Sequence, residues 1–299
     1  MRLRITLSGT NGTKPSVKSV RSLIYRTLSL ADGNYAKWLH DYGYEYRTVR
    51  REETVRQDQA QGLQSPEYFS DRYKAAKPFV FSHPYVVKDV TGEVIMFKLA
   101  SPDSEFASIF ALGAAKMMAI PIPPEHGVLG IARISMAPDP EIYSSRETTK
   151  HYFCLSPIIA QGKRDGKTHY YMDANDPEVA ALLFRNITSK WLSVTGQNIG
   201  QRFVRDIVGG RMETEPFAIR FDRPQAVMNH MGHKEFPAFM TSFTVKTTGN
   251  IHRAILELGL GQKNAMGFGM VEEAGNARFR QGLGRLLRHE GDTEEKQRH

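Results

Sequence analysis

The chain has 299 residues, of which 40% are hydrophobic and 24% charged, a composition typical of a soluble globular protein with one large or two ordinary domains. Its 40 Lys and Arg against 32 Asp and Glu give a net charge of +8, which suits a polyanionic partner. The single cysteine excludes an internal disulfide, no Cys/His set has zinc-site spacing, and no apolar run reaches the roughly 20 residues of a membrane span. We therefore expect a cytoplasmic protein with no membrane contact, no metal and no cofactor.

The chain opens with the pattern of a strand followed by two helices. Residues 2–8 alternate apolar and polar side chains, which is the period of a half-buried strand. The apolar spacing then becomes helical, and one flank of this helix carries a stripe of Lys14, Lys18, Arg21 and Tyr25. Asp32-Gly33-Asn34 breaks the helix, and a second helical run covers residues 35–41. One continuous helix would hold Tyr25 and His40 about 22 Å apart, whereas a fold-back at Gly33 could bring them together.

The remainder of the first half completes a β-α-β-β-α-β order, which is that of a ferredoxin-like unit. Residues 47–77 are polar and aperiodic, so we interpret them as an insertion. The predicted elements after it are strands at 79–82 and 93–99, a helix that begins at 101–105, and a strand at 128–136. Pro138 and Pro140 mark a linker, so we expect the N-terminal domain to cover residues 1–138.

The second half repeats this order of elements. The predicted elements are a strand at 152–155, a basic hairpin tip at 161–167, a helix at 179–192, strands at 217–221 and 239–245, and a helix from Asn250. The fold class we expect is therefore α+β, with two tandem ferredoxin-like domains, the second over residues 149–275. Residues 276–299 have the pattern of a basic amphipathic tail.

A glycine-rich stretch follows the last predicted helix. Gly259, Gly261, Gly267 and Gly269 form a G-x-G-x5-G-x-G array around Lys263. The stretch leaves a helix and enters a strand, whereas a dinucleotide-binding or Walker loop leads from a strand into a helix. Two interpretations remain. The glycines could let backbone amides and Lys263 approach a passing phosphate backbone, or they could form a tight turn that packs a helix on a sheet.

With Leu256-Glu257-Leu258 before it and Met270-Val271 after it, this stretch resembles the C-terminal glycine-rich motif of the RAMP superfamily. It is similar in detail to that of the CRISPR-associated endoribonucleases that cut precursor CRISPR RNA. The resemblance extends to Leu23-Ile24-Tyr25, to Leu39-His40 with Gly43, and to Phe153-Cys154-Leu155-Ser156-Pro157. It thus covers both ends and the middle of the chain.

The resemblance implies a metal-independent endoribonuclease in which His40 is the catalytic histidine and Tyr25 assists it. An imidazole can both accept and donate a proton near neutral pH, as cleavage by the RNA's own 2′-hydroxyl requires. The expected products carry a 2′,3′-cyclic phosphate and a 5′-hydroxyl. Several members of the family place a lysine shortly after the histidine, where this chain has Tyr44-Glu45-Tyr46-Arg47. Arg47, which we include with the catalytic residues, Lys37 and the Arg50-Arg51 run remain alternatives for that positive charge.

The resemblance also implies CRISPR repeat RNA as the partner, and leaves open whether the chain joins other effector-complex subunits or forms a homodimer. The candidate RNA-binding residues are Lys18, Arg21, Lys163, Arg164, Lys167, Arg202, Arg205 and the glycine stretch with Lys263. The alternative function is a non-catalytic RAMP subunit that holds CRISPR RNA in an effector complex. His230 and His233 could suggest a metal pair, but no third ligand is evident and a polar loop is favoured. Cys154 is expected in the core.

Overall fold

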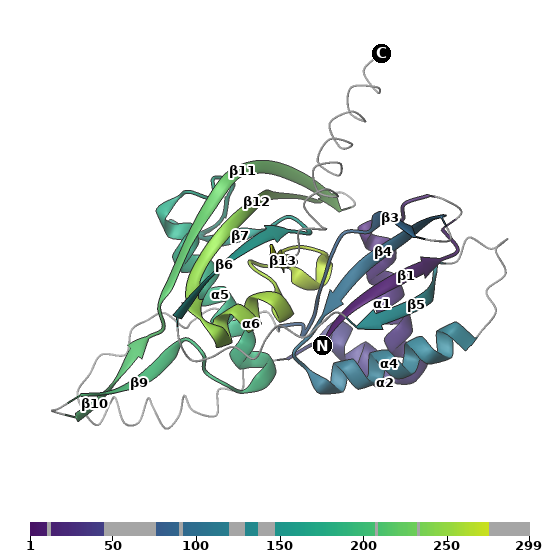
Figure 1. The fold of residues 1–299 in the computed structure, drawn as a ribbon, viewed down its shortest axis with the longest axis horizontal. Coiled ribbons are helices and arrows are strands. Elements are labelled where there is room, and N and C mark those ends of the chain that lie inside the picture. The colour runs from purple at the N-terminus through teal and green to yellow at the C-terminus, as the bar shows by residue number, and fades with distance from the viewer. Residues whose placement is uncertain are drawn as a thin grey trace, which may run out of the picture.

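The fold consists of two lobes, each built on its own antiparallel sheet, with the amino terminus between them (Figure 1). The structure is a computed structural model and describes residues 1–10, 13–44, 76–89, 92–119, 129–136, 147–206, 209–231 and 234–274. Arg47, Arg50-Arg51, the predicted insertion up to residue 75, the linker prolines and the tail lie outside the described residues. None of the helices in these ranges is both long and apolar enough to cross a bilayer.

The N-terminal lobe has the strand order of a ferredoxin-like sheet. The sheet runs β2-β4-β1-β5, and β3 also pairs with β4, so the second strand of the fold is divided between β2 and β3. The bounds are β1 Arg2–Ser8, β2 Val80–Phe81, β3 Tyr85–Asp89, β4 Gly92–Ala100 and β5 Gly130–Met136. Helices α1 (Val17–Ala31) and α4 (Ser104–Ala119) share a core with one face of this sheet. The two helices cross closely because Gly113 has no side chain to collide with the carbonyl oxygen of Thr27.

The C-terminal lobe repeats this topology with longer strands and two added hairpins. Its sheet runs β11-β12-β6-β13, and α5 and α6 share its core. The bounds are β6 Glu147–Cys154, β7 Ala160–Arg164, β8 Lys167–Tyr171, α5 Pro177–Thr195, β9 Gln201–Asp206, β10 Gly209–Thr214, β11 Phe217–Met231, β12 Lys234–Thr248, α6 Gly249–Leu258 and β13 Val271–Glu273. The predicted fold class is confirmed, and Cys154 is buried as expected.

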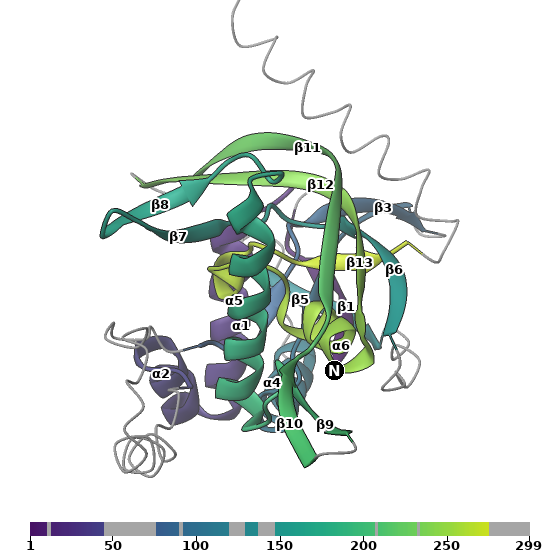
Figure 2. The same ribbon diagram turned by 90° about the vertical axis from the view of Figure 1, so that its left-hand side faces the viewer.

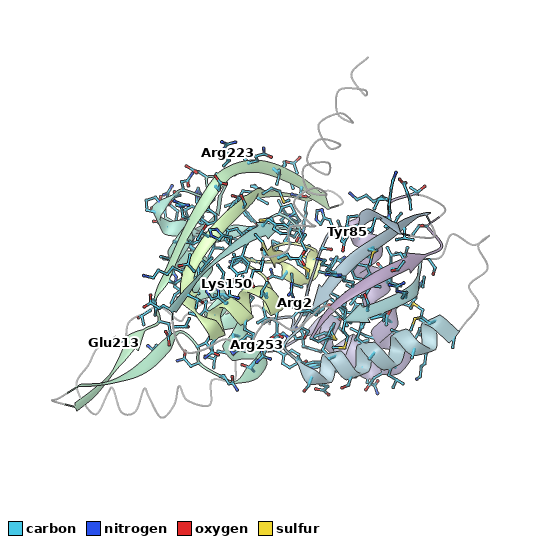
Figure 3. The ribbon with its side chains drawn as sticks, viewed as in Figure 1. Arg2, Tyr85, Lys150, Glu213, Arg223 and Arg253 are labelled. Carbon is cyan, nitrogen blue, oxygen red and sulfur yellow. The ribbon has the colours of Figure 1, made fainter. Side chains whose placement is uncertain are left out.

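Three features of this lobe and its neighbour were not predicted. β3 and the β9–β10 hairpin were missed, and β11 and β12 are 15 residues each rather than five and seven. The β9–β10 hairpin extends away from the two sheets in Figure 1. β11 continues past a bulge between Asp222 and Gln225, where Arg223 has a φ of 51° and lies on the outer side of the strand (Figure 3).

Polar contacts join the two lobes near the amino terminus. The Met1 ammonium donates to the carbonyl oxygen of Ser101 at 2.7 Å and lies 3.3 Å from the Glu257 carboxylate of α6. Figure 2 shows α6 beside this terminus. Lys98 of β4 pairs with Glu272 of β13, and the Lys98 side chain is buried. These contacts fix the N-terminal lobe against the elements that flank the glycine stretch.

Candidate active site

Asp32 ends α1 and begins α2 (Gly33–Asp41). Its backbone is extended, with φ −147° and ψ 102°, and its N–H donates to the Leu28 carbonyl oxygen at 2.8 Å. Its carboxylate accepts from the backbone N–H of Tyr35 at 2.9 Å, which caps α2. The predicted fold-back is confirmed, but the residue that makes it is Asp32, because Gly33 is already the first residue of α2.

The fold-back brings Tyr25 and His40 together. Their ring centroids are 5.3 Å apart with an interplanar angle of 78°, an edge-to-face contact. Tyr25 also packs edge-on against Phe79, 6.0 Å between centroids, and Phe79 stacks on Phe106 at 5.0 Å. The phenol is therefore held by the aromatic core on one side and lies beside the imidazole on the other.

Burial reinforces the neutral form of the Tyr25 phenol. It raises the pKa of the phenol to about 12, although the charge of Arg21 acts in the opposite direction. Tyr25 therefore carries its proton at neutral pH. In this structure it can serve as a hydrogen-bond donor, but not as a base.

His40 is open to solvent and oriented by its neighbour. Its side chain is 68% exposed, and Nδ1 lies 3.0 Å from Oδ1 of Asp41. A proton on Nδ1 would be donated to that carboxylate, and Nε2 would then be the atom that accepts a proton from a substrate. Because Asp41 is itself 42% exposed, the pair orients the ring more than it stabilises the fold.

Lys77 lies at the carboxyl end of α2, and its place in the site was not predicted from the sequence. Its ammonium donates to the carbonyl oxygens of Leu39 and, at 3.0 Å, His40. Burial lowers the pKa of Lys77, while the charge of Asp41 opposes that effect. A cation at this end of a helix is favoured by the helix dipole. Lys77 therefore holds the backbone of the predicted catalytic histidine.

A short bridge brings Lys77 back to α2 from 37 residues further along the chain. Tyr44 and Ala76 exchange backbone hydrogen bonds of 2.9 and 3.0 Å. Gly43 leaves room for this return: its φ is 80°, and a Cβ there would lie 2.9 Å from the Lys77 ammonium. Gly43 was the only sequence signal of this arrangement. Of the other candidate cations, Lys37 is exposed on α2 and Arg47 lies outside the described residues.

The glycine stretch leads from α6 into β13, as predicted, and it folds on itself. Gly259, Gly261, Gly267 and Gly269 all have φ between 70° and 89°. A Cβ on Gly261 would collide with the Ile159 carbonyl oxygen, and one on Gly269 with that of Leu260. The amides of Leu260, Gln262 and Gly269 donate to internal carbonyl oxygens at 2.7–2.9 Å. Internal packing therefore accounts for the glycines, and an RNA-binding role for this stretch remains a prediction.

Lys190 of α5 organises the same stretch from inside the lobe. Its ammonium lies 2.8 Å from the Gly259 carbonyl oxygen, 3.0 Å from that of Gly261 and 2.7 Å from Oδ1 of Asn264. Burial lowers the pKa of Lys190 well below its usual value. The Asn264 amide in turn donates to the carbonyl oxygens of Leu260 and Phe268. The partly buried Lys190 side chain thus gathers carbonyl groups that would otherwise lack donors.

The glycine stretch also touches the N-terminal lobe at the start of α1. A Cβ on Gly267 would collide with the Val17 side chain and lie 3.2 Å from the Phe81 ring. Along α1, Val17 and Tyr25 are about 12 Å apart. Lys18 and Arg21 lie between them, so a basic path on α1 connects the glycine stretch to the Tyr25–His40 pair.

The other predicted RNA-binding residues lie on the C-terminal lobe. Lys163, Arg164 and Lys167 are exposed at the turn between β7 and β8. Arg202 and Arg205 are on β9, opposite Glu213 and Gly210 of β10. Lys263 has a φ of 59°, and its ammonium lies 5.0 Å from the centre of the Phe236 ring. These residues form separate groups and do not converge on His40 through any described contact.

Of the two histidines near the turn between β11 and β12, His230 does not lie in the predicted polar loop. His230 lies within β11, paired in register with Glu235 of β12, so that prediction was wrong for His230; His233 lies outside the described residues. Within the ranges that the structure describes, no three His, Cys, Asp or Glu side chains are placed to share a metal ion.

The chain is similar to known proteins in part of its sequence and in its fold. Residues 137–273 match the family model of CRISPR associated protein Cas6, C-terminal. No curated protein matches the chain in sequence. Similar solved structures include a Cas6-related protein from Pyrococcus furiosus, with 15% identity, a TM-score of 0.61 and coverage of 92% of this chain and 99% of that one. A CRISPR associated protein Cas6 has 21% identity, a TM-score of 0.57 and the same coverage.

A third structure, described as a RAMP protein binding different RNA substrates, has 15% identity, a TM-score of 0.60 and coverage of 91% and 99%. At these identities the likeness concerns the fold. The chain therefore shares the fold of these structures, two tandem ferredoxin-like units, as the resemblance implied. In particular, residues 137–273 match the Cas6 C-terminal family model, and the chain as a whole has the fold of Cas6 structures.

Proposed function

We propose that this protein is a cytoplasmic endoribonuclease that cleaves CRISPR repeat RNA in precursor transcripts to mature guide RNA. The observation that carries the proposal is the Tyr25–His40 contact, 5.3 Å between ring centroids, at the end of the basic flank of α1. The Cas6 fold supports it, as does the description of one structural neighbour as a RAMP protein binding RNA substrates. A basic helix flank attracts the RNA backbone, and an exposed imidazole can reach it.

In the proposed reaction the nucleophile belongs to the RNA. A base removes the proton of the 2′-hydroxyl, the 2′-oxygen bonds to the adjacent phosphorus, and the bond from phosphorus to the 5′-oxygen breaks as that oxygen gains a proton. His40 serves as general acid/base, because an imidazole side chain can both accept and donate a proton. Tyr25 donates its phenol proton in a hydrogen bond to a phosphate oxygen. The products carry a 2′,3′-cyclic phosphate and a 5′-hydroxyl, and the residues named require no metal.

Lys77→Met is expected to lower the single-turnover cleavage rate at saturating protein by about 10- to 100-fold, with little change in RNA affinity. The reason is that the Lys77 ammonium holds the backbone of Leu39 and His40, and a small displacement of a catalytic group costs about this much. Lys77→Arg, which keeps the charge and the donors, should recover part of the rate. An equal loss of affinity and rate would instead assign Lys77 to RNA binding.

The function is tested by incubating the purified protein with end-labelled repeat RNA and excess EDTA. The expected result is one discrete product whose 3′ end resists phosphatase until acid opens the cyclic phosphate. A band shift without any product would support the non-catalytic RNA-holding alternative. A strict requirement for a divalent metal would contradict the proposed chemistry.

A further inference from the structure

An aromatic pair is exposed on the flank of α2 that faces away from His40. Trp38 and Tyr42 are four residues apart and therefore share one side of the helix. Trp38 is 37% exposed and Tyr42 is 63% exposed. His40 is two residues from each of them, which places it on the opposite flank. The other tryptophan, Trp191, is a core residue with 4% exposure, so exposure sets Trp38 apart.

The Trp38 indole is held from behind. Its ring packs edge-on against Tyr44, 5.1 Å between centroids at 75°, and lies tilted against Tyr35 at 5.7 Å. The Tyr44 hydroxyl donates to the carboxylate of Asp103, and the Tyr35 hydroxyl lies 3.5 Å from the same carboxylate. Asp103 also accepts from the backbone N–H of Phe106, at the start of α4. The side chains that support the indole are therefore bonded to Asp103, which lies at the start of α4.

The phenols of this support stay protonated. Burial is the largest cause that raises the pKa of both Tyr35 and Tyr44 above the ordinary phenol value. They therefore remain donors that can keep the Asp103 carboxylate in place. Such a support gives a large ring little freedom before any ligand arrives, so that binding to its open face costs little entropy.

We propose that Trp38, with Tyr42 beside it, is a stacking site for an unpaired base of the RNA near the scissile phosphate, which rests on the proposed function. Aromatic rings next to a basic surface are the usual platform for single-stranded RNA, because every base has a π-face. Lys37, exposed beside Trp38 in the sequence, supplies charge for the adjoining phosphate. An α-helix with its side chains is about 10–12 Å wide, so a base at Trp38 and a phosphate at His40 are a few nucleotides apart.

The chain's two tryptophans make the test direct. Because Trp191 is buried in the core, a change in tryptophan fluorescence on adding RNA should come from Trp38. The probe is repeat RNA made uncleavable by a 2′-deoxy substitution at the cleavage site. We expect it to quench the wild-type fluorescence, and Trp38→Phe to bind similarly without the quenching. Trp38→Ala should bind about 10-fold more weakly, within the range measured for loss of one base stack.

A scan with single abasic nucleotides identifies the base and supplies the control. One abasic position should weaken binding to the wild type and have no further effect on Trp38→Ala. Leu112→Ala, an exposed apolar residue of α4, should leave affinity unchanged, and thermal melts should show all variants folded. The stacking site would be overturned if anisotropy showed RNA binding but the tryptophan fluorescence was not quenched. It would also be overturned if the fluorescence changed only with protein concentration. Neither outcome would contradict the proposed function. Failure of the wild type to bind RNA would instead count against the function.

Discussion

His40→Ala is expected to abolish cleavage of repeat RNA while RNA binding persists. The expected loss in cleavage rate is about 10²- to 10⁴-fold. This is the range that a positioned general acid or base contributes, and His40 is the imidazole that the fold-back at Asp32 brings to Tyr25. Its side chain is 68% exposed and holds no core position, so its removal should leave the fold intact. The measurement is single-turnover cleavage at saturating protein, beside an affinity measurement with uncleavable RNA.

His151→Ala is the matched control for this prediction. His151 is an exposed histidine of β6 that pairs with the Thr244 hydroxyl, so its loss removes an imidazole of the same kind from the other lobe. The control should cleave at close to the wild-type rate once the enzyme is saturating. Full activity in His40→Ala would remove the proposed acid/base from the mechanism. Loss of RNA binding in that variant would assign His40 to substrate binding.

The part of the site that could be predicted depends on local patterns. The helical spacing after residue 16 and the turn residues at 32–34 were enough to expect two helices whose fold-back could bring Tyr25 and His40 together. The α+β order also followed from local periodicity, because each strand and helix of a ferredoxin-like unit buries one face. Asp32 was part of the predicted turn, but its role as the cap of both helices depends on its backbone conformation, which the sequence pattern does not specify.

The unpredicted part depends on contacts between distant segments. Lys77 reaches α2 from 37 residues beyond His40, and Lys190 lies more than 60 residues before the carbonyl groups that it binds. Neither lysine forms a motif with its sequence neighbours. The sequence also left two explanations for the glycines, since positive φ and close approach serve a ligand and a packed backbone equally. The carbonyl oxygens that crowd Gly261 and Gly269 come from the protein itself.

Gly269→Ala is expected to destabilise the protein by about 3 kcal/mol or more. Gly269 has a φ of 71°, and a Cβ there would collide with the Leu260 carbonyl oxygen and lie 2.6 Å from the Asn264 amide. Both groups belong to the frame around Lys190, because Asn264 is bonded to its ammonium. The strain therefore cannot be relieved by moving one flexible side chain.

Gly166→Ala separates this packing effect from backbone strain. Gly166 has nearly the same φ, 74°, but no atom lies within 4 Å of a Cβ added there. Its substitution should cost only the left-handed conformation, about 1–2 kcal/mol. Urea denaturation of both variants measures the difference, with the denaturant slope checked for a common unfolded state. Equal destabilisation would mean that the glycine stretch yields to a methyl group, and that the need for glycine at 269 comes from a partner outside the protein. A clear excess in Gly269→Ala would instead trace that need to the Leu260 carbonyl oxygen and the Asn264 amide that crowd the position.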